Sequence, residues 1–254
     1  IIMQSHDSYY EEVNMAKSLY SNRVSGVICS LAMETRDTSH FQQFSNNNIP
    51  LVFVDRVPKD YNTFRVVIDN YSAGYKATKH LIEQGCIRIA HLTAGSEFGN
   101  LYNERKRGYI EALKDHNLPI DEELIINLKS VTYEEGVKAS NQLFDLDPIP
   151  DGLFAPGDII AVSAVQTAKK RGIKVPDEIA IIGFNNDPIS QIIDPNISTI
   201  THPAEKMGKA AAEIIIKNLK SQKSDDAKEI TFLNTEVLAR ESSDKNKSLE
   251  TIVK

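Results

Sequence analysis

The sequence is poor in cysteine and has no long apolar run. Its 254 residues contain two cysteines, Cys29 and Cys86, and neither belongs to a CxxC pair or has a histidine at metal-site spacing. We therefore expect two separate buried thiols, as in proteins of a reducing compartment, rather than a disulfide or a zinc site. A membrane-spanning helix needs ~18 consecutive apolar residues. No stretch approaches that length, so we expect no insertion into a membrane.

An excess of basic residues and the common enzyme motifs are also missing. Lysine and arginine total 29 against 35 acidic residues, and the net charge of -6 argues against nucleic-acid binding by this chain alone. The sequence contains no GxGxxG, GxxxxGK(S/T), HExxH or GxSxG motif. Its six histidines are dispersed, without the spacing of metal ligands. We therefore expect a binding role rather than catalysis, with no metal and no cofactor.

The start of the chain has neither an initiator methionine nor a signal peptide. Residues 1–5, Ile-Ile-Met-Gln-Ser, have the pattern of the second half of a β-strand. We expect the chain to be a fragment of a longer protein, with the segment that decides compartment and partner outside the sequence.

The most informative stretch is the apolar run 179–182 together with the polar residues that follow it. Four consecutive apolar residues are too continuous for a strand with one wet face, so the run predicts a strand of a parallel sheet covered by helices on both faces. Ligands of such sheets bind just outside the carboxyl ends of the strands. Asn185, Asn186 and Asp187 fall at that place, and the stretch therefore predicts a binding site.

The rest of the chain alternates between strand and helix patterns joined by short Gly, Pro and Asp connections, which indicates a doubly wound α/β fold. We expect strands at 24–30, 51–55, 65–69, 87–94, 123–129, 152–155 and 197–202. We expect helices at 9–20, around 41–44, and at 70–85, 103–117, 133–146, 158–171 and 203–219. After a polar turn at 222–228, residues 230–233 and 236–240 are predicted to pair as a hairpin, followed by a polar tail.

Seven sequence segments occur in the order found in one protein family. They are residues 64–75, 80–85 with 88–90, Arg105 followed by Gly108-Tyr109, and residues 172–178, 182–186, 198–203 and 240–243. Over nearly its whole length the sequence resembles the LacI-GalR family of bacterial transcription regulators. The resemblance implies the family's effector-binding core, similar in fold to type I periplasmic sugar-binding proteins. It also implies that the helix-turn-helix, the hinge helix and the first strand and helix of the core are not part of this chain.

This resemblance implies an α/β architecture of two Rossmann-like subdomains, each a parallel sheet flanked by helices, with the ligand in a cleft between them. The family pattern places the N-terminal subdomain at residues 1–70 plus 203–229. The C-terminal subdomain is expected at 71–202 plus 230–254, so that the chain crosses three times.

The resemblance also implies which side chains face the ligand. Arg105 matches the family arginine that reaches into the cleft, where its fork of donors suits paired hydroxyls or a carboxylate; otherwise it is a helix-surface arginine. Asn185 stands where many relatives have an aspartate. Because an amide both donates and accepts, this departure allows a less polar or an anionic effector; otherwise Asn185 caps a turn.

Four further residues have a structural alternative beside a ligand role. Asp69 either accepts from the ligand or caps the helix that follows it. Asp55 and Arg56 end an apolar strand, and Arg56 is either a second cationic donor or the partner of Asp55 in a surface pair. Asp158 resembles a family position at a helix start, where capping is the favoured interpretation.

Two aspects of the ligand pocket stay open in the sequence. His202 is expected beside the cleft, either contacting the ligand or serving a structural role. Val131 falls where relatives often have an aromatic residue that stacks on a sugar ring, and valine cannot stack. Tyr133 or Phe98 are the candidates to replace it.

The predicted function is the ligand-sensing and dimerisation core of a cytoplasmic regulator. A small effector, a sugar or sugar derivative, is expected to bind between the lobes and to change DNA affinity allosterically in a homodimer. Operator DNA would be contacted only through the headpiece that this chain lacks. The alternative is a periplasmic sugar-binding protein of a transporter, which shares the fold.

Overall fold

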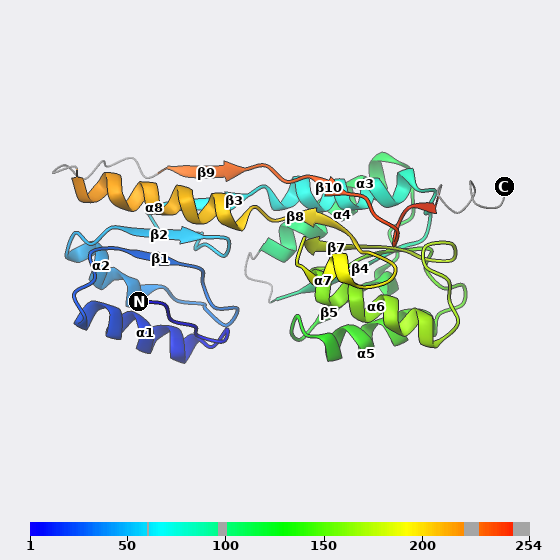
Figure 1. Ribbon diagram of the computed structural model, residues 1–254, viewed down its shortest axis with the longest axis horizontal. Helices are drawn as coiled ribbons and strands as arrows, with labels where there is room; N and C mark the ends of the chain where they lie inside the picture. The colour runs from blue at the N-terminus through cyan, green and yellow to red at the C-terminus, as the bar shows by residue number, and fades with distance from the viewer. Residues whose placement is uncertain (60, 96–100, 221–228, 246–254) are drawn as a thin grey trace. The chain divides into compact units, whose positions relative to one another are not determined.

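The computed structural model describes residues 1–59, 61–95, 101–220 and 229–245 (Figure 1). The chain divides into two compact units, unit 1 (Ile1–Ile68 and Pro203–Asn234) and unit 2 (Asp69–His202 and Thr235–Lys254). It therefore passes from one unit to the other three times. The first passage lies two residues before the expected boundary at residue 70, and the last lies five residues after the one expected at residue 229.

Unit 1 is built on a four-stranded parallel sheet of order β1-β2-β3-β9. Its strands are β1 (Val27–Cys29), β2 (Leu51–Val54), β3 (Phe64–Ile68) and β9 (Ile230–Leu233). Its helices are α1 (Tyr9–Ser21), the short 3₁₀ helix η1 (Ser39–Phe41), α2 (Gln42–Asn46) and α8 (Ala204–Lys220). Residues 1–5 belong to no strand, in contrast to the expectation from their apolar pattern.

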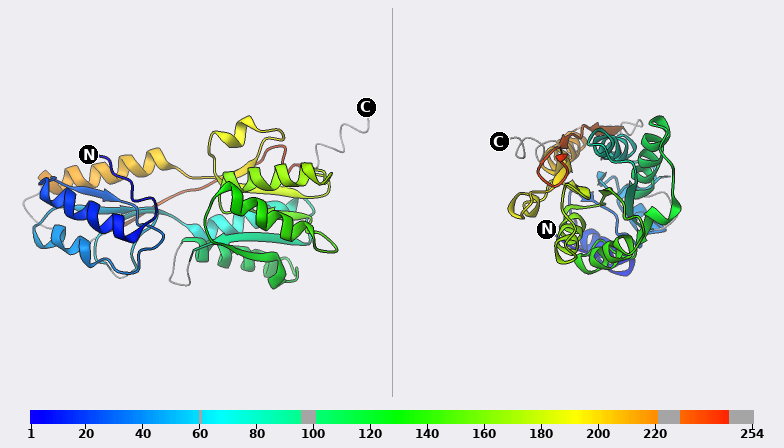
Figure 2. Two further views of the ribbon diagram at one scale, coloured as in Figure 1. Left: turned by 90° about the horizontal axis from the view of Figure 1, so that it is seen from below. Right: turned by 90° about the vertical axis from the view of Figure 1, so that its right-hand side faces the viewer.

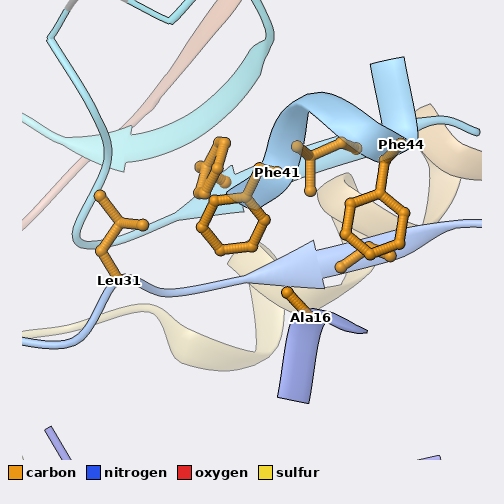
Figure 3. Close-up of a cluster of buried hydrophobic side chains, with 7 residues drawn as sticks. Ala16, Leu31, Phe41 and Phe44 are labelled. Carbon is orange, nitrogen blue, oxygen red and sulfur yellow. The ribbon is translucent and has the colours of Figure 1, made fainter. Parts of the chain in front are cut away.

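Successive residues of β2 point to opposite faces of this sheet, as the pleat requires. Val52 packs with Met207 and Ala211 of α8 on one face. Phe53 packs on the other face in an apolar cluster that includes Phe41 and Phe44 (Figure 3). The sheet of unit 1 is thus covered by helices on both sides, which explains why its strands have almost no polar residues.

The hairpin predicted at 230–240 is wrong. Strand β9 pairs in parallel with β3, with Ile230 opposite Arg65 and Leu233 opposite Ile68. Strand β10 (Val237–Leu238) pairs with a strand of unit 2. Two adjacent short strands look like a hairpin in sequence because local pattern carries no information on distant partners. The polar turn expected at 222–228 and the end of the tail lie outside the described residues.

Unit 2 contains a six-stranded sheet of order β10-β8-β7-β6-β4-β5, parallel except for β10. Its parallel strands are β4 (Ile89–Ala94), β5 (Ile125–Leu128), β6 (Gly152–Phe154), β7 (Ala180–Asn185) and β8 (Ser198–Thr201). Its helices are α3 (Asn70–Glu83), α4 (Leu101–Asp115), η2 (Glu122–Leu124), α5 (Tyr133–Phe144), α6 (Asp158–Lys170) and α7 (Ile189–Ile192). The predicted α/β architecture of parallel strands flanked by helices is confirmed.

Strand β7 is buried along its length until Asn185, as its apolar run predicts. A Cβ at Gly183 would meet Asp158 and Ala161 of α6, whereas the next residue, Phe184, lies against Arg105 of α4. Helices α6 and α4 therefore cover opposite faces of the sheet. Helix α5 packs beside α6, and α3 packs beside α4 (Figure 2).

The two cysteines are free thiols in different units, partly buried at Cys29 and buried at Cys86. Burial raises the pKa of Cys29 to about 12 and that of Cys86 to about 11. Both thiols are therefore protonated at neutral pH. None of the helices in the described ranges is both long and apolar enough to cross a membrane.

Candidate functional site

Polar side chains gather at the carboxyl ends of β7 and β8 in unit 2, with Arg105 as the buried cation among them. The side chain of Arg105 is on α4 and only 3% of the residue is exposed. Its Nε donates to Asn70 Oδ1 at 2.9 Å and its Nη1 to the carbonyl oxygen of Pro156 at 3.1 Å. Its guanidinium carbon lies 3.4 Å from the centre of the Phe184 ring, a cation–π contact. The guanidinium is therefore fixed in place.

Close packing of α4 against α3 and against the sheet determines how deeply Arg105 is buried. Helix α4 packs against α3 so closely that a Cβ on Gly74 would lie 2.2 Å from the backbone oxygen of Arg105. A Cβ on Gly108 would lie 2.1 Å from the backbone oxygen of Tyr71. The hydroxyl of Tyr109 donates to the carbonyl of Ile89 at 2.8 Å, which fixes α4 to the sheet. The Gly108-Tyr109 pair thus sets the depth at which Arg105 enters unit 2.

Asn185 ends β7 and begins a turn with unusual backbone geometry. Asn185 has φ 105° and Asn186 has φ 60°, the positive region that asparagine tolerates better than most non-glycine residues. The Asn185 amide nitrogen lies 3.4 Å from Asp187 Oδ2, a long hydrogen bond. Both asparagines are half-buried. The turn presents amide groups at the edge of the sheet, where ligands of parallel sheets bind.

Asp158 is the first residue of α6 and is fully buried. Its Oδ2 accepts from the backbone N–H of Asp187 at 2.6 Å, and its Oδ1 accepts from the hydroxyl of Thr199 at 2.7 Å. The capping interpretation is wrong, because Gly157 is the N-cap and the Asp158 carboxylate binds groups outside α6. Burial is the main cause that raises the pKa of Asp158 to about 6.

The remaining candidates in unit 2 lie at element ends. Asp69 is exposed, and its side chain caps α3 by accepting from the Ser72 N–H at 2.9 Å, which confirms the capping alternative. His202 follows β8 and is half-buried. Its backbone N–H donates to the backbone carbonyl of Asn185 at 3.3 Å. It thus lies next to the turn.

The aromatic replacement for Val131 is not identified by the structure. The hydroxyl of Tyr133, on the first residue of α5, donates to Gln166 Oε1 at 2.6 Å. Phe98 lies outside the described residues. No cluster of three or more His, Cys, Asp or Glu side chains suited to a metal ion occurs in the part of the chain that the structure describes.

In unit 1, Asp55 and Arg56 follow β2. Asp55 has φ 58°, again in the positive region. Arg56 Nη1 donates to Asp7 Oδ1 at 2.5 Å, and the two side chains are 28% and 48% exposed. The partner of Arg56 in this ion pair is therefore Asp7, which lies 49 positions away, and not the neighbouring Asp55 of the surface-pair alternative.

Several residues of the unit 2 site were not selected from the sequence. Asn70 and Phe184 hold Arg105, and Thr199 holds Asp158. Arg240 Nη2 donates to Asn186 Oδ1 at 2.6 Å, and its Nη1 donates to the carbonyl of Ile197 at 2.7 Å. All four lie inside the segments that carry the family resemblance, and this was the available signal.

A buried histidine also lies near enough to Arg105 for the charge of Arg105 to act on it. His91 on β4 is 1% exposed and stacks against the rings of Tyr109 and Phe154. Burial lowers its pKa to about 3, so it is neutral at physiological pH. Its Nε2 and the hydroxyl of Thr93 have no hydrogen-bond partner among the described residues. No sequence pattern singled out either residue.

Comparisons with known proteins agree on one family. Residues 78–243 match the model of the periplasmic binding protein-like domain. The chain is 30% identical over 229 residues to the HTH-type transcriptional repressor PurR of Actinobacillus pleuropneumoniae serotype 3 (strain JL03), covering 90% of the chain and 67% of that protein. It is 33% identical over 204 residues to the regulator DegA of Bacillus subtilis (strain 168), covering 78% of the chain and 58% of DegA.

Solved structures give the same result. The transcriptional regulator CelR in complex with cellobiose superposes with a TM-score of 0.81 at 28% identity, over 92% of this chain and 71% of CelR. The regulator CcpA of Lactococcus lactis superposes with a TM-score of 0.84 at 26% identity, over 96% of this chain and 87% of CcpA. These relatives are named as regulators, not as enzymes or transport proteins. The chain belongs to the LacI family of transcription regulators and comprises their periplasmic-binding-protein-like domain.

Proposed function

We propose that this chain is the effector-sensing and dimerisation core of a cytoplasmic DNA-binding regulator. Its effector is a small sugar or sugar derivative. The observation that carries the proposal is the fixed guanidinium of Arg105 beside the Asn185 turn at the carboxyl ends of β7 and β8. The structure of the relative CelR, a complex with cellobiose, supports a sugar-like ligand.

The ligand contacts follow from the chemistry of these groups. Arg105 would donate to paired hydroxyls or to an anionic group, and the Asn185 amide would both donate and accept. His202 in unit 2 is proposed as a further contact, and so is Asp69 through its Oδ2, because its Oδ1 caps α3. Asp55 and Arg56 are the proposed contacts from unit 1. Asp158 directs both carboxylate oxygens to protein donors, so its role differs from theirs.

Signal transmission is proposed to be allosteric. An effector shifts a conformational equilibrium only by the difference in its affinity for the two states. An effector that binds one state more tightly would therefore shift the equilibrium toward that state, and a DNA-reading headpiece outside this chain would respond.

A homodimer would couple two such headpieces to one operator. Its proposed surface is on α6 and α7, where Ile159, Ile189 and Ile192 are 36%, 37% and 76% exposed. Exposed isoleucines favour association between copies.

A thermal-shift screen tests the effector class. Cellobiose, glucose 6-phosphate, gluconate and hypoxanthine represent sugars, sugar phosphates, sugar acids and purines. A ligand that binds only the folded protein raises Tm. We expect a rise with one of the first three compounds. A rise with hypoxanthine alone would replace the sugar with a purine, and no rise with any compound would contradict a sugar-like effector.

Arg105→Met tests the site. It keeps most of the apolar volume and removes the charge, and we expect it to abolish the ligand-induced rise in Tm. Arg107→Met is the matched control, because Arg107 is on the same helix with a side chain that is 66% exposed and paired with Glu104. Equal ligand-induced shifts in the two variants would remove Arg105 from the site.

A further inference from the structure

The turn after β7 holds its backbone in a conformation that needs support. Asn185 and Asn186 both have positive φ, at 105° and 60°. Residues other than glycine adopt this region only where the surroundings fix it. Asn185 tolerates it better than most residues, but two in succession require specific partners for their backbone groups.

The partners are Asp158 and Thr199. Asp158 Oδ2 accepts from the N–H of Asp187 at 2.6 Å. Thr199 Oγ1 accepts from the N–H of Asn186 at 3.2 Å and donates its own proton to Asp158 Oδ1 at 2.7 Å. One buried carboxylate thus fixes two successive amides of the turn, one directly and one through a hydroxyl. It also fixes the polarity of that hydroxyl.

The strand below the carboxylate is shaped to admit it. A Cβ at Gly183 would lie 2.2 Å from Asp158 Oδ1, so only glycine leaves room at this position. The guanidinium of Arg240 also holds this turn, because its Nη2 donates to the side-chain oxygen Asn186 Oδ1 at 2.6 Å. Contacts therefore converge on the turn from α6, β8 and the C-terminal segment.

We infer that Asp158 is a positioning residue, whose carboxylate acts with the Thr199 hydroxyl to set the turn that directs Asn185 toward the effector. The inference rests on the proposed function only in giving Asn185 an effector to contact. The hydrogen bonds by which Asp158 holds the turn are present in the protein without effector.

Protonation of Asp158 gives this inference a measurable signature. Burial raises its pKa to about 6, while the bonds from Thr199 and Asp187 N–H oppose that rise. The charged groups that act on it are Asp187, which raises the pKa, and Arg240, which lowers it. Protonation gives one carboxyl oxygen an O–H donor and makes it a weaker acceptor, so one of the two bonds weakens or reverses below about pH 6.

Amide NMR of the uniformly ¹⁵N-labelled chain, titrated from pH 4.5 to 8, tests this. We expect the Asp187 amide resonance to move with a midpoint near the pKa of Asp158, and Asp158→Asn to abolish that step. Asp177→Asn, an exposed carboxylate of the same unit, should leave it unchanged. An Asp187 amide that does not titrate, or that titrates equally in Asp158→Asn, would overturn the inference.

The hydroxyl provides a second test if Asp158→Asn does not fold. Thr199→Val should displace the amide resonances of Asn185 and Asn186, and Thr199→Ser should restore the wild-type positions. Unchanged Asn185 and Asn186 resonances in Thr199→Val would also overturn the inference. Both readouts use protein without effector, so an unsuccessful effector screen would leave their meaning intact.

Discussion

Each unit has one arginine among the candidate ligand contacts, and the two side chains differ in burial and in their partners. The arginine of unit 2 is Arg105 on α4, and that of unit 1 is Arg56, which follows β2. Arg105 of unit 2 is 3% exposed, stacks on Phe184 and donates to Asn70 and Pro156. Arg56 of unit 1 forms a single ion pair with Asp7, with more than a quarter of its side chain exposed. A buried, multiply bonded cation is preorganised, whereas an exposed pair exchanges with solvent at little cost.

This difference suggests a division of work between the units. The polar groups of unit 2 are ordered when the protein folds. Binding of the proposed ligand would therefore not have to supply the free energy of ordering them. The surface pair of unit 1 is free of such constraints and would reorganise on binding of the proposed effector. The following variants would break or sharpen this contrast.

The largest effect is expected from glycines in helices of the two units. Gly74→Ala would place a methyl group 2.2 Å from the backbone of Arg105 and should lower the free energy of unfolding by about 3 kcal/mol. Gly208 on α8 of unit 1 has open space at its Cβ, so Gly208→Ala should raise it by about 0.5–1 kcal/mol. Urea denaturation measures both. A similar change in both variants would show that the α3–α4 contact is not tightly packed.

The second prediction concerns pH. The pKa of Asp158 is raised by folding to about 6, so its contribution to stability is present below about pH 4 and is lost as pH rises through 6. The pKa of His91 is lowered to about 3, so its contribution is present above pH 6.5 and is lost as pH falls. The two contributions oppose each other between about pH 4 and 6.

Asp158→Asn removes the first of these contributions. The free energy of unfolding of the variant minus that of the wild type should rise by up to roughly 3 kcal/mol between pH 4 and pH 7. A constant difference between the two proteins does not affect this rise. Urea denaturation at several pH values gives the difference. A difference that is constant with pH would show that the Asp158 carboxyl titrates normally. A difference that grows from pH 4 to pH 7 would mean that the ionised Asp158 carboxylate, which holds the turn of unit 2, lowers the stability of the folded protein.

The sequence predicted the layers of the fold because apolar runs and their spacing are local. It also selected Arg105 and Asn185, which lie in recognisable segments. It failed where the outcome depends on distant partners: β9 pairs with β3, Arg56 pairs with Asp7, and Asp158 binds Thr199. Capping of α3 by Asp69 was predictable as one of two local alternatives, because its partner is three residues away.

The third prediction compares exposed isoleucines of the two units. Ile192→Asp on α7 should raise the dissociation constant of the proposed dimer at least about tenfold, because a charge would be buried on association. Ile216→Asp on α8 of unit 1, at a residue that is 50% exposed, should leave it within about threefold. Sedimentation equilibrium gives both constants. Weaker association in Ile216→Asp alone would move the dimer surface to unit 1.

The contrast between the arginines is tested most directly by calorimetric titration of Arg105→Met and Arg56→Met with the effector found in the thermal-shift screen. Loss of a charged hydrogen bond from a buried donor costs about 2–3 kcal/mol, so we expect Arg105→Met to raise Kd roughly 100-fold. We expect Arg56→Met to raise it less than about fivefold, because an exposed pair contributes under about 1 kcal/mol. Equal losses, or a larger loss in Arg56→Met, would contradict the assignment of the fixed ligand contact to unit 2.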